Sequence, residues 1–164
     1  MSGFESRVNS GALKISVVGT TTLGASNSSS GEIALVEADD AALNLVSNPG
    51  RDVYLSAGGS LTDNNGASTT NVAGANLYLS TGGYVDLDTD VSALNDWLAY
   101  GNIGQDLTIR ELDSITLGSN TILSTSDGDI DIRTAGGTIT VTNLVAGGTG
   151  DVRLVAGGGG SDIE

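Results

Sequence analysis

A short motif recurs seven times along the chain and constrains its fold more than any other feature. Each copy has the form small or polar, polar, aliphatic, any residue, aliphatic, as in "RDVYLSAGG" (51–59) and "GDVRLVAGG" (150–158). The first aliphatic residues of successive copies are separated by 20, 20, 24, 30, 23 and 22 residues. A repeat of this length is typical of solenoids, in which each repeat packs on its neighbours. The seven aliphatic pairs are Leu13/Ile15, Ile33/Leu35, Val53/Leu55, Leu77/Leu79, Leu107/Ile109, Ile130/Ile132 and Val152/Leu154.

Most repeats contain a second aliphatic segment after a glycine corner such as Gly58-Gly59 or Gly82-Gly83. Glycine permits a tight bend because it has no Cβ. Residues two apart in a strand point to the same side, so each pair turns both side chains inward. The second segments are Leu61, Val85/Leu87, Ile115/Leu117 and Ile139/Val141.

Three short strands joined by such corners close one turn, and stacked turns place equivalent strands in parallel. The sequence therefore predicts an all-β fold, a single-stranded parallel β-helix of about seven coils of 20–24 residues. An antiparallel β-sandwich also has closely spaced short strands and is the structural alternative. The repeated order of strand, glycine corner and strand favours the solenoid.

One step in the series is longer than the others and predicts an insertion. We expect an inserted loop over about residues 88–105, "DTDVSALNDWLAYGNIGQ", within a β-helical domain that spans residues 11–164. Residues 1–10 are expected to be an N-terminal lead, either an expression start or an edge segment.

The expected loop contains the chain's one tryptophan, Trp97, beside Leu98 and Tyr100. Val91, Leu94 and Leu98 are three and four residues apart, a spacing compatible with a helical turn. Two interpretations are open. The loop covers the side of the β-helix, or its aromatic residues form an exposed interface, where Trp and Tyr are enriched.

The composition excludes several functional classes. The chain carries 20 acidic and 6 basic residues, a net charge of −14, and so lacks the basic patch that nucleic acid or an anionic membrane surface requires. Without cysteine or histidine it cannot form a disulfide, a His- or Cys-dependent nucleophilic triad, or a zinc site built from these residues. No transmembrane segment, catalytic residue or cofactor is expected.

Alternating aspartates are the remaining candidates for chemistry. Asp86, Asp88 and Asp90 alternate along one stretch, and Asp127, Asp129 and Asp131 along another, so each set is expected on one solvated outer face. Paired carboxylates would suit a polysaccharide-degrading β-helix. They would also suit calcium, for which the candidates are Asp86, Asp88, Asp127, Asp129 and Asp162. Asp162 ends "GGGGSD" (157–162), which begins like a calcium-binding nonapeptide, but Glu164 stands where an aliphatic residue belongs.

The segments "RDVYLSAGGSLTDNNG" (51–66) and "GDIDIRTAGGTITVTN" (128–143) resemble the haemagglutinin-type repeats of filamentous-haemagglutinin-like bacterial exoproteins and related autotransporter-like surface proteins. The resemblance covers about residues 11–163. It implies a right-handed β-helical shaft that is exported unfolded and displayed on the cell surface. The family's amino-terminal secretion motifs are not found, which favours a shaft segment.

The expected function is therefore structural and non-catalytic, as a shaft or spacer of a secreted bacterial surface adhesin or extracellular matrix protein. The alternative is a subunit of an extracellular filament formed by end-to-end stacking. Val152, Leu154 and Ile163 would then contact a second copy, where a longer chain would place its flanking coils. A host receptor or glycan is a further expected partner. Carbohydrate binding and ice binding, the latter through Thr138, Thr140 and Thr142, are less favoured.

Overall fold

The structure is a computed structural model that describes residues 5–9, 12–17, 21–26 and 31–164, with side chains described for 24–26 and 31–164. This part of the chain contains strands and no helix. The strands are β1 (Glu5–Asn9), β2 (Ala12–Val17), β3 (Thr21–Ser26), β4 (Ile33–Glu37), β5 (Ala41–Ser47), β6 (Val53–Ala57), β7 (Leu61–Asp63), β8 (Val72–Thr81), β9 (Val85–Asp96), β10 (Leu107–Glu111), β11 (Ile115–Leu117), β12 (Leu123–Ser124), β13 (Ile130–Thr134), β14 (Ile139–Val141), β15 (Leu144–Val145) and β16 (Val152–Val155).

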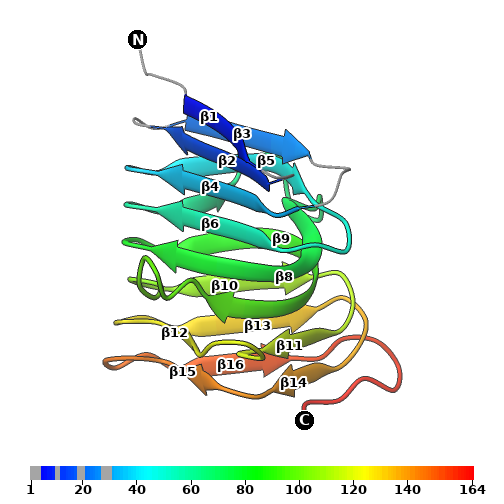
Figure 1. Ribbon diagram of the computed structural model, residues 1–164. Coiled ribbons are helices and arrows are strands. Elements are labelled where there is room, and N and C mark those ends of the chain that lie inside the picture. Colours follow the sequence, from blue (N-terminus) through cyan, green and yellow to red (C-terminus); the bar gives the residue numbers. More distant parts are fainter. Residues whose placement is uncertain (1–4, 10–11, 18–20, 27–30) are drawn as a thin grey trace.

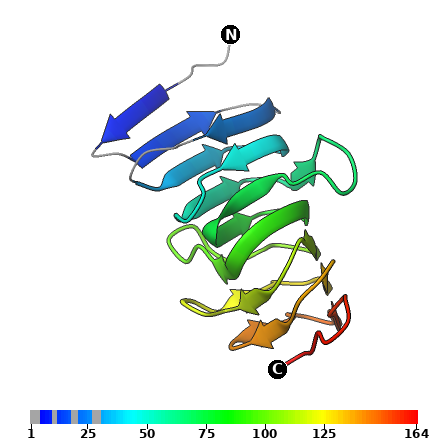
Figure 2. The ribbon, with the colours of Figure 1, turned by 90° about the vertical axis from the view of Figure 1, so that its right-hand side faces the viewer.

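The strands stack into a parallel β-helix, which confirms the predicted fold class. In one column, here column 2, β3, β5, β7, β9, β10, β13 and β16 pair successively in parallel. Seven strands are separated by six steps, so the solenoid has about six turns. Figures 1 and 2 show the coils stacked between the two chain ends. Strand β1, within the expected N-terminal lead, pairs antiparallel with β2 and is an edge strand.

A second column, here column 1, contains β2, β4, β6 and the end of β8. Its register aligns Leu13 with Ile33, Ile33 with Val53, and Val53 with Leu77. The first four motif copies therefore stack as predicted. The side chains of Leu13 and Ile15 lie outside the described residues, whereas Ile33, Leu35, Val53, Leu55, Leu77 and Leu79 are all buried.

The last three motif copies belong to the other column, contrary to the prediction. Leu107 aligns with Val85, the predicted second segment, and not with Leu77. Ile130 and Val152 then follow Leu107 in column 2. Both columns carry the same aliphatic alternation, so the motif alone does not show which column a copy joins.

The predicted insertion over residues 88–105 is wrong for residues 88–96, because β9 continues to Asp96. Val91 and Leu94 are buried strand residues and not part of a helical turn. The step of 30 residues from Leu77 to Leu107 is the sum of two shorter steps. The chain moves eight residues from Leu77 in column 1 to Val85 in column 2, then 22 residues around one coil to Leu107.

The core between the columns is aliphatic. Its 25 clustered side chains include no aromatic residue, so the described aromatic residues lie on the outside of the coils. Fully burying a Val, Leu or Ile side chain contributes about 1.5–3 kcal/mol. The predicted inward residues Leu107, Ile109, Ile130 and Ile132 are all inaccessible to solvent.

An aspartate directly before a strand of column 2 caps the coil that follows it. Asp106 Oδ1 accepts a hydrogen bond from the backbone N–H of Asp129 (2.9 Å), and Asp129 Oδ1 accepts one from Asp151 (2.8 Å). At the same corner, Asp40 Oδ1 accepts the N–H of Ser60 (2.7 Å). Each carboxylate thereby accepts the backbone N–H of the residue at the equivalent position in the next coil.

The glycine corners bring successive coils into contact too close for any side chain. A Cβ on Gly58 would collide with the carbonyl oxygen of Ala38, and a Cβ on Gly82 with that of Gly58. A Cβ on Gly104 would in turn collide with the carbonyl of Gly82. These glycines are therefore required by the coil spacing.

We expect Gly82→Ala to lower the free energy of unfolding by about 1–3 kcal/mol, because the added methyl group overlaps a backbone carbonyl that cannot rotate away. Urea unfolding followed by circular dichroism measures the loss. Gly136→Ala is the matched control, because a Cβ there meets no atom within 4 Å. Equal stability of the two variants would contradict the close approach at Gly82.

Candidate functional site

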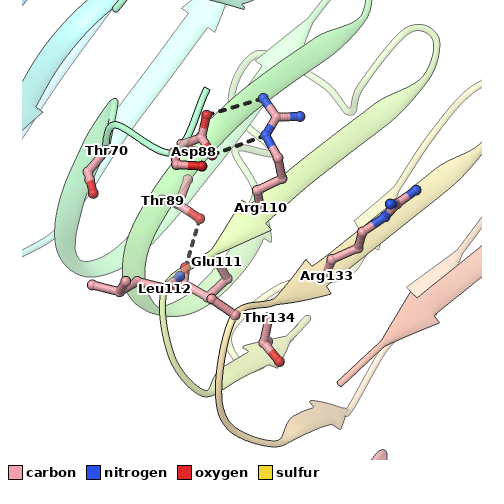
Figure 3. Close-up of a pocket in the computed structure, with 10 residues that line it drawn as sticks. Thr70, Asp88, Thr89, Arg110, Glu111, Leu112, Arg133 and Thr134 are labelled. Atoms are coloured by element: carbon pink, nitrogen blue, oxygen red, sulfur yellow. Dashed lines mark hydrogen bonds and ion pairs between the residues drawn. The ribbon is translucent and has the colours of Figure 1, made fainter. Parts of the chain in front are cut away.

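A charged groove runs across the outward side of column 2. Asp88, Arg110 and Arg133 occupy the same position on the neighbouring strands β9, β10 and β13. Beside this row, Asp131 on β13 aligns with Arg153 on β16. Three of the chain's six basic residues thus lie on one face, and Figure 3 shows the part around Arg110.

Arg110 is held by two carboxylates of the preceding coil. Its Nε lies 3.0 Å from Asp88 Oδ1, and its Nη1 lies 2.7 Å from Asp86 Oδ1. Burial alone would lower the pKa of Arg110, but the hydrogen bonds to Asp88 and Asp86 outweigh it and raise the pKa. The predicted solvated face is therefore wrong for Asp88, which is buried and paired with Arg110.

The next two arginines share a single carboxylate. Arg133 Nη2 lies 2.6 Å from Asp131 Oδ2, and Arg153 Nη1 lies 3.2 Å from the same atom. The hydrogen bond from Arg133 is the main cause of a lowered pKa at Asp131. Both guanidinium groups remain about half exposed, so this end of the face is open to solvent.

Glu111 forms the inner wall of the groove, although its sequence context did not mark it as a site residue. It is 2 % exposed, and its carboxylate accepts hydrogen bonds from Thr89 Oγ1 (2.7 Å) and from the backbone N–H groups of Leu112 (2.8 Å) and Val91 (3.1 Å). The cavity beside it measures about 250 Å³ and is also lined by Thr134. This volume lies just below the range of about 300–1,000 Å³ usual for small-ligand pockets.

A sequence signal for Glu111 existed in the motif itself. Glu37 occupies the same place at the end of "IALVE" (33–37) as Glu111 does in "LTIRE" (107–111). Glu37 is also buried, and its Oε1 accepts the N–H groups of Ala38 (2.8 Å) and Asp39 (3.3 Å). A glutamate at this position therefore fastens the backbone of the coil corner.

The structure engages four of the five predicted calcium ligands with other groups. Asp86 and Asp88 face Arg110, Asp129 caps the backbone of Asp151, and Asp162 Oδ1 accepts the N–H of the neighbouring Ile163. Within the described residues, the group of three acidic side chains close enough to share one cation is Asp90, Glu111 and Asp113, with ligand atoms within 4.8 Å of one another. Calcium binding through the predicted aspartates, including the exposed Asp127, stays a prediction.

The predicted interface residues fall into two places. Trp97 is half-buried, whereas Leu98 and Tyr100 beside it are exposed. On the last coil, Val152 and Ile163 are nearly half exposed and Leu154 is partly buried. The two groups are separate surfaces.

Comparisons of the chain with protein-family models, curated proteins and solved structures found no significant match. Among the described residues there is no helix long and apolar enough to cross a membrane. Arg110 and Arg153 pair with carboxylates of the preceding coil, whereas Arg133 pairs with Asp131 of its own strand. The buried carboxylate of Glu111 accepts hydrogen bonds from Thr89 of the preceding coil and from the backbone of its own corner. Most of these contacts join neighbouring coils.

Two buried carboxyl groups make stability depend on pH. Burial raises the pKa of Glu111 from 4.5 to about 7 and that of Asp96 from 3.8 to about 6. Since the folded state binds these protons more tightly than the unfolded state, their stabilisation is full below the unfolded pKa values and is lost as pH rises through about 6–7.

We expect the midpoint of thermal unfolding to rise when the pH falls from 8 to 5. Replacing Glu111 by Gln should reduce that rise. The raised pKa of Glu111 increases the free energy of unfolding at pH 5, relative to pH 8, by at most about 3 kcal/mol. Differential scanning calorimetry across this pH range measures the effect. The matched control is Glu32→Gln, which makes the same chemical change at an exposed position. A pH dependence unchanged by Glu111→Gln would contradict the assignment.

Proposed function

We propose that this chain is a non-catalytic shaft segment of a secreted bacterial surface adhesin or extracellular matrix protein. The observation that supports this best is the unbroken ladder of column 2, in which each strand from β3 to β16 pairs in parallel with the next. Because equivalent positions recur in every coil, the same contacts repeat along the axis. A solenoid of this kind keeps the two ends of the chain at a set distance.

The polar contacts between coils support the same proposal. Arg110 bridges to the coil before it, and Asp129 caps the coil after it. Arg153 and Glu111 also contact the preceding coil, whereas Arg133 pairs with Asp131 of its own strand. The resemblance to haemagglutinin-type repeats and the charge of −14, which opposes lateral association, support an extracellular shaft.

Stretching single molecules between their two ends tests the mechanical role. We expect the chain to lengthen in steps of about 70–80 Å, because each coil releases 20–24 residues of about 3.4 Å. Loss of the whole structure in one event at low force would contradict a load-bearing shaft.

Exposure of the chain to a panel of polysaccharides tests the non-catalytic part of the proposal. We expect no new reducing or unsaturated ends. Product release by the natural chain that is lost in Glu111→Gln would overturn the proposal and indicate a polysaccharide-degrading enzyme.

A filament subunit is the second candidate, favoured by the surface of the last coil. Among the described strands, β16 pairs only with β13, and Val152, Val155 and Ile163 there are between 36 and 48 % exposed. An apolar, half-paired strand is a template for another strand of the same kind. A second copy stacked there would make a contact that repeats without closing and so form a fibre.

Electron microscopy of the purified chain over a range of concentrations tests the filament. We expect rods that lengthen in increments of about 34 Å, because each added copy contributes six coil spacings of its own and one across the junction. Val152→Glu combined with Ile163→Glu should abolish the lengthening. Leu45→Glu is the control, because Leu45 is 45 % exposed on the side of β5. Rods of a single short length at every concentration would exclude assembly through this end.

A further inference from the structure

Four of the chain's six aromatic residues gather at one place on the outside of the coils. The rings of Tyr54 and Tyr78 are stacked, with centroids 4.5 Å apart and planes at 7°. Trp97 lies 5.2 Å from Tyr54 and 4.3 Å from Tyr100, tilted by about 55° to each. Since the core needs no aromatic side chain, this cluster is a surface feature with its own explanation.

The coil register and one turn assemble the cluster. Tyr54 on β6 is aligned with Tyr78 on β8, so their outward side chains stack one coil apart. The end of β9 lies beside β8, and the N–H of Trp97 donates to the carbonyl of Leu79 (2.7 Å). A turn closed by the N–H of Tyr100 and the carbonyl of Trp97 (2.9 Å) then projects from the stack (Figure 2).

Beside this turn lies a groove of about 520 Å³, which falls within the range usual for small-ligand sites. Its floor consists of small residues from successive coils, where the glycine corners leave no side chain above the backbone. Tyr100 stands at its edge. The floor residues are Ser56, Gly58, Ser80, Gly82, Gly104 and Ser126.

The groove also contains polar groups able to hold a ligand in one orientation. Ser56 and Ser80 place hydroxyl groups one coil spacing apart, and Asn102 adds an amide that accepts a hydrogen bond from Ser126 (3.0 Å). Glu37 lines the groove and is 3 % exposed, and its Oε2 has no hydrogen-bond partner in the described structure. A buried carboxylate oxygen without a donor is costly, so a ligand hydroxyl that supplied one would be favoured.

The charge of the groove selects the kind of ligand. None of its described lining residues is basic, and Glu37 is acidic, in a chain of net charge −14. An anionic ligand would therefore be repelled. The Tyr100 ring, the hydroxyl groups, an amide and a carboxylate together match a neutral sugar, whose ring has an apolar C–H face and a rim of hydroxyl groups.

We propose that this groove, beside Trp97 and Tyr100, binds a neutral oligosaccharide. The lining residues come from five successive coils, from Glu37 to Ser126, which spans about 19 Å along the axis. A chain of sugar rings fits this shape better than a single sugar, with one ring against Tyr100, the one aromatic residue that lines the groove, and hydroxyl groups directed to the serine floor. The site is independent of the shaft function and of the charged groove on column 2.

The single tryptophan makes binding measurable, because Trp97 lies against Tyr100, which lines the groove. Trp97 fluorescence is recorded while the purified chain is titrated with neutral oligosaccharides, namely cello-, xylo-, malto- and chito-oligosaccharides of two to six rings. We expect a saturable change with at least one series and tighter binding as the chain lengthens. Oligogalacturonate and heparin oligosaccharides, which are anionic, should produce no change. Saturable binding of the anionic sugars alone, or of none of the sugars, would overturn the proposal.

Two variants locate the site. Tyr100→Ala keeps the fluorescent reporter and removes a side chain that is 49 % exposed, so the fold should survive while affinity falls roughly tenfold. Tyr84→Ala is the matched control, because Tyr84 is 45 % exposed and does not line the groove. Unchanged affinity in Tyr100→Ala, or an equal loss in Tyr84→Ala, would place binding elsewhere and contradict the proposal.

Trp97→Ala distinguishes a packing role of Trp97 from a binding role. Binding by this variant is measured by calorimetry, since the reporter is lost, and its thermal midpoint is compared with that of the natural chain. Weaker binding at an unchanged midpoint supports the proposal. A lowered midpoint with unchanged affinity would mean that Trp97 only covers Tyr54, and the proposed role of Trp97 would fall.

Discussion

The parallel register between coils is the constraint on which the rest of this structure depends. Every residue in a strand lies about 4.8 Å from the residue at the equivalent position one coil away. The side chains at equivalent positions of adjacent coils must therefore pack against each other. Inside, this produces aliphatic columns such as Ile33, Val53 and Leu77. At the corners it demands glycine over glycine, as at Gly58 and Gly82, where carbonyl oxygens occupy the space of a Cβ.

The same register explains the acidic residues at the coil corners, whose role is not evident from the sequence. Backbone groups at a corner fall outside the regular ladder and need other partners. Asp106 and Asp129 accept hydrogen bonds from backbone N–H groups of the coil that follows them. Glu37 and Glu111 accept hydrogen bonds from backbone N–H groups of their own corner. Burial of Glu111 for this purpose raises its pKa, which is why a structural contact also makes stability depend on pH.

The outer faces of the two columns differ in chemistry. The register aligns equivalent positions of successive coils, but outward positions can carry different residue types. On column 2, Arg110 pairs with Asp86 and Asp88 of the preceding coil, and Arg153 pairs with Asp131 of the coil before it. On column 1, Tyr54 and Tyr78 stack, and the turn after β9 adds Trp97 and Tyr100. The charged face of column 2 joins neighbouring coils. The face of column 1 carries the groove proposed to bind a ligand.

The aliphatic pairs two residues apart and the spacing of 20–24 residues were sufficient to predict a parallel β-helix, because side-chain alternation is a local property of strands. The inward residues from Ile33 to Ile132 followed from the same pattern. The column that each pair joins could not be predicted, since both columns carry one motif. That choice depends on how far the chain advances around each coil.

The candidate sites were less predictable for the same reason. Nothing local to Asp88 indicates that Arg110, 22 residues later, lies against it, or that Trp97 lies against Tyr54. Residues 88–96 of the expected loop are strand, because Val91 pairs with β8 and Ala93 and Leu94 pair with both β8 and β11. The sequence alone therefore determined the class of fold and its aliphatic core. Only the tertiary structure decided which charges pair and where the aromatic residues meet, because these contacts join residues one or two coils apart.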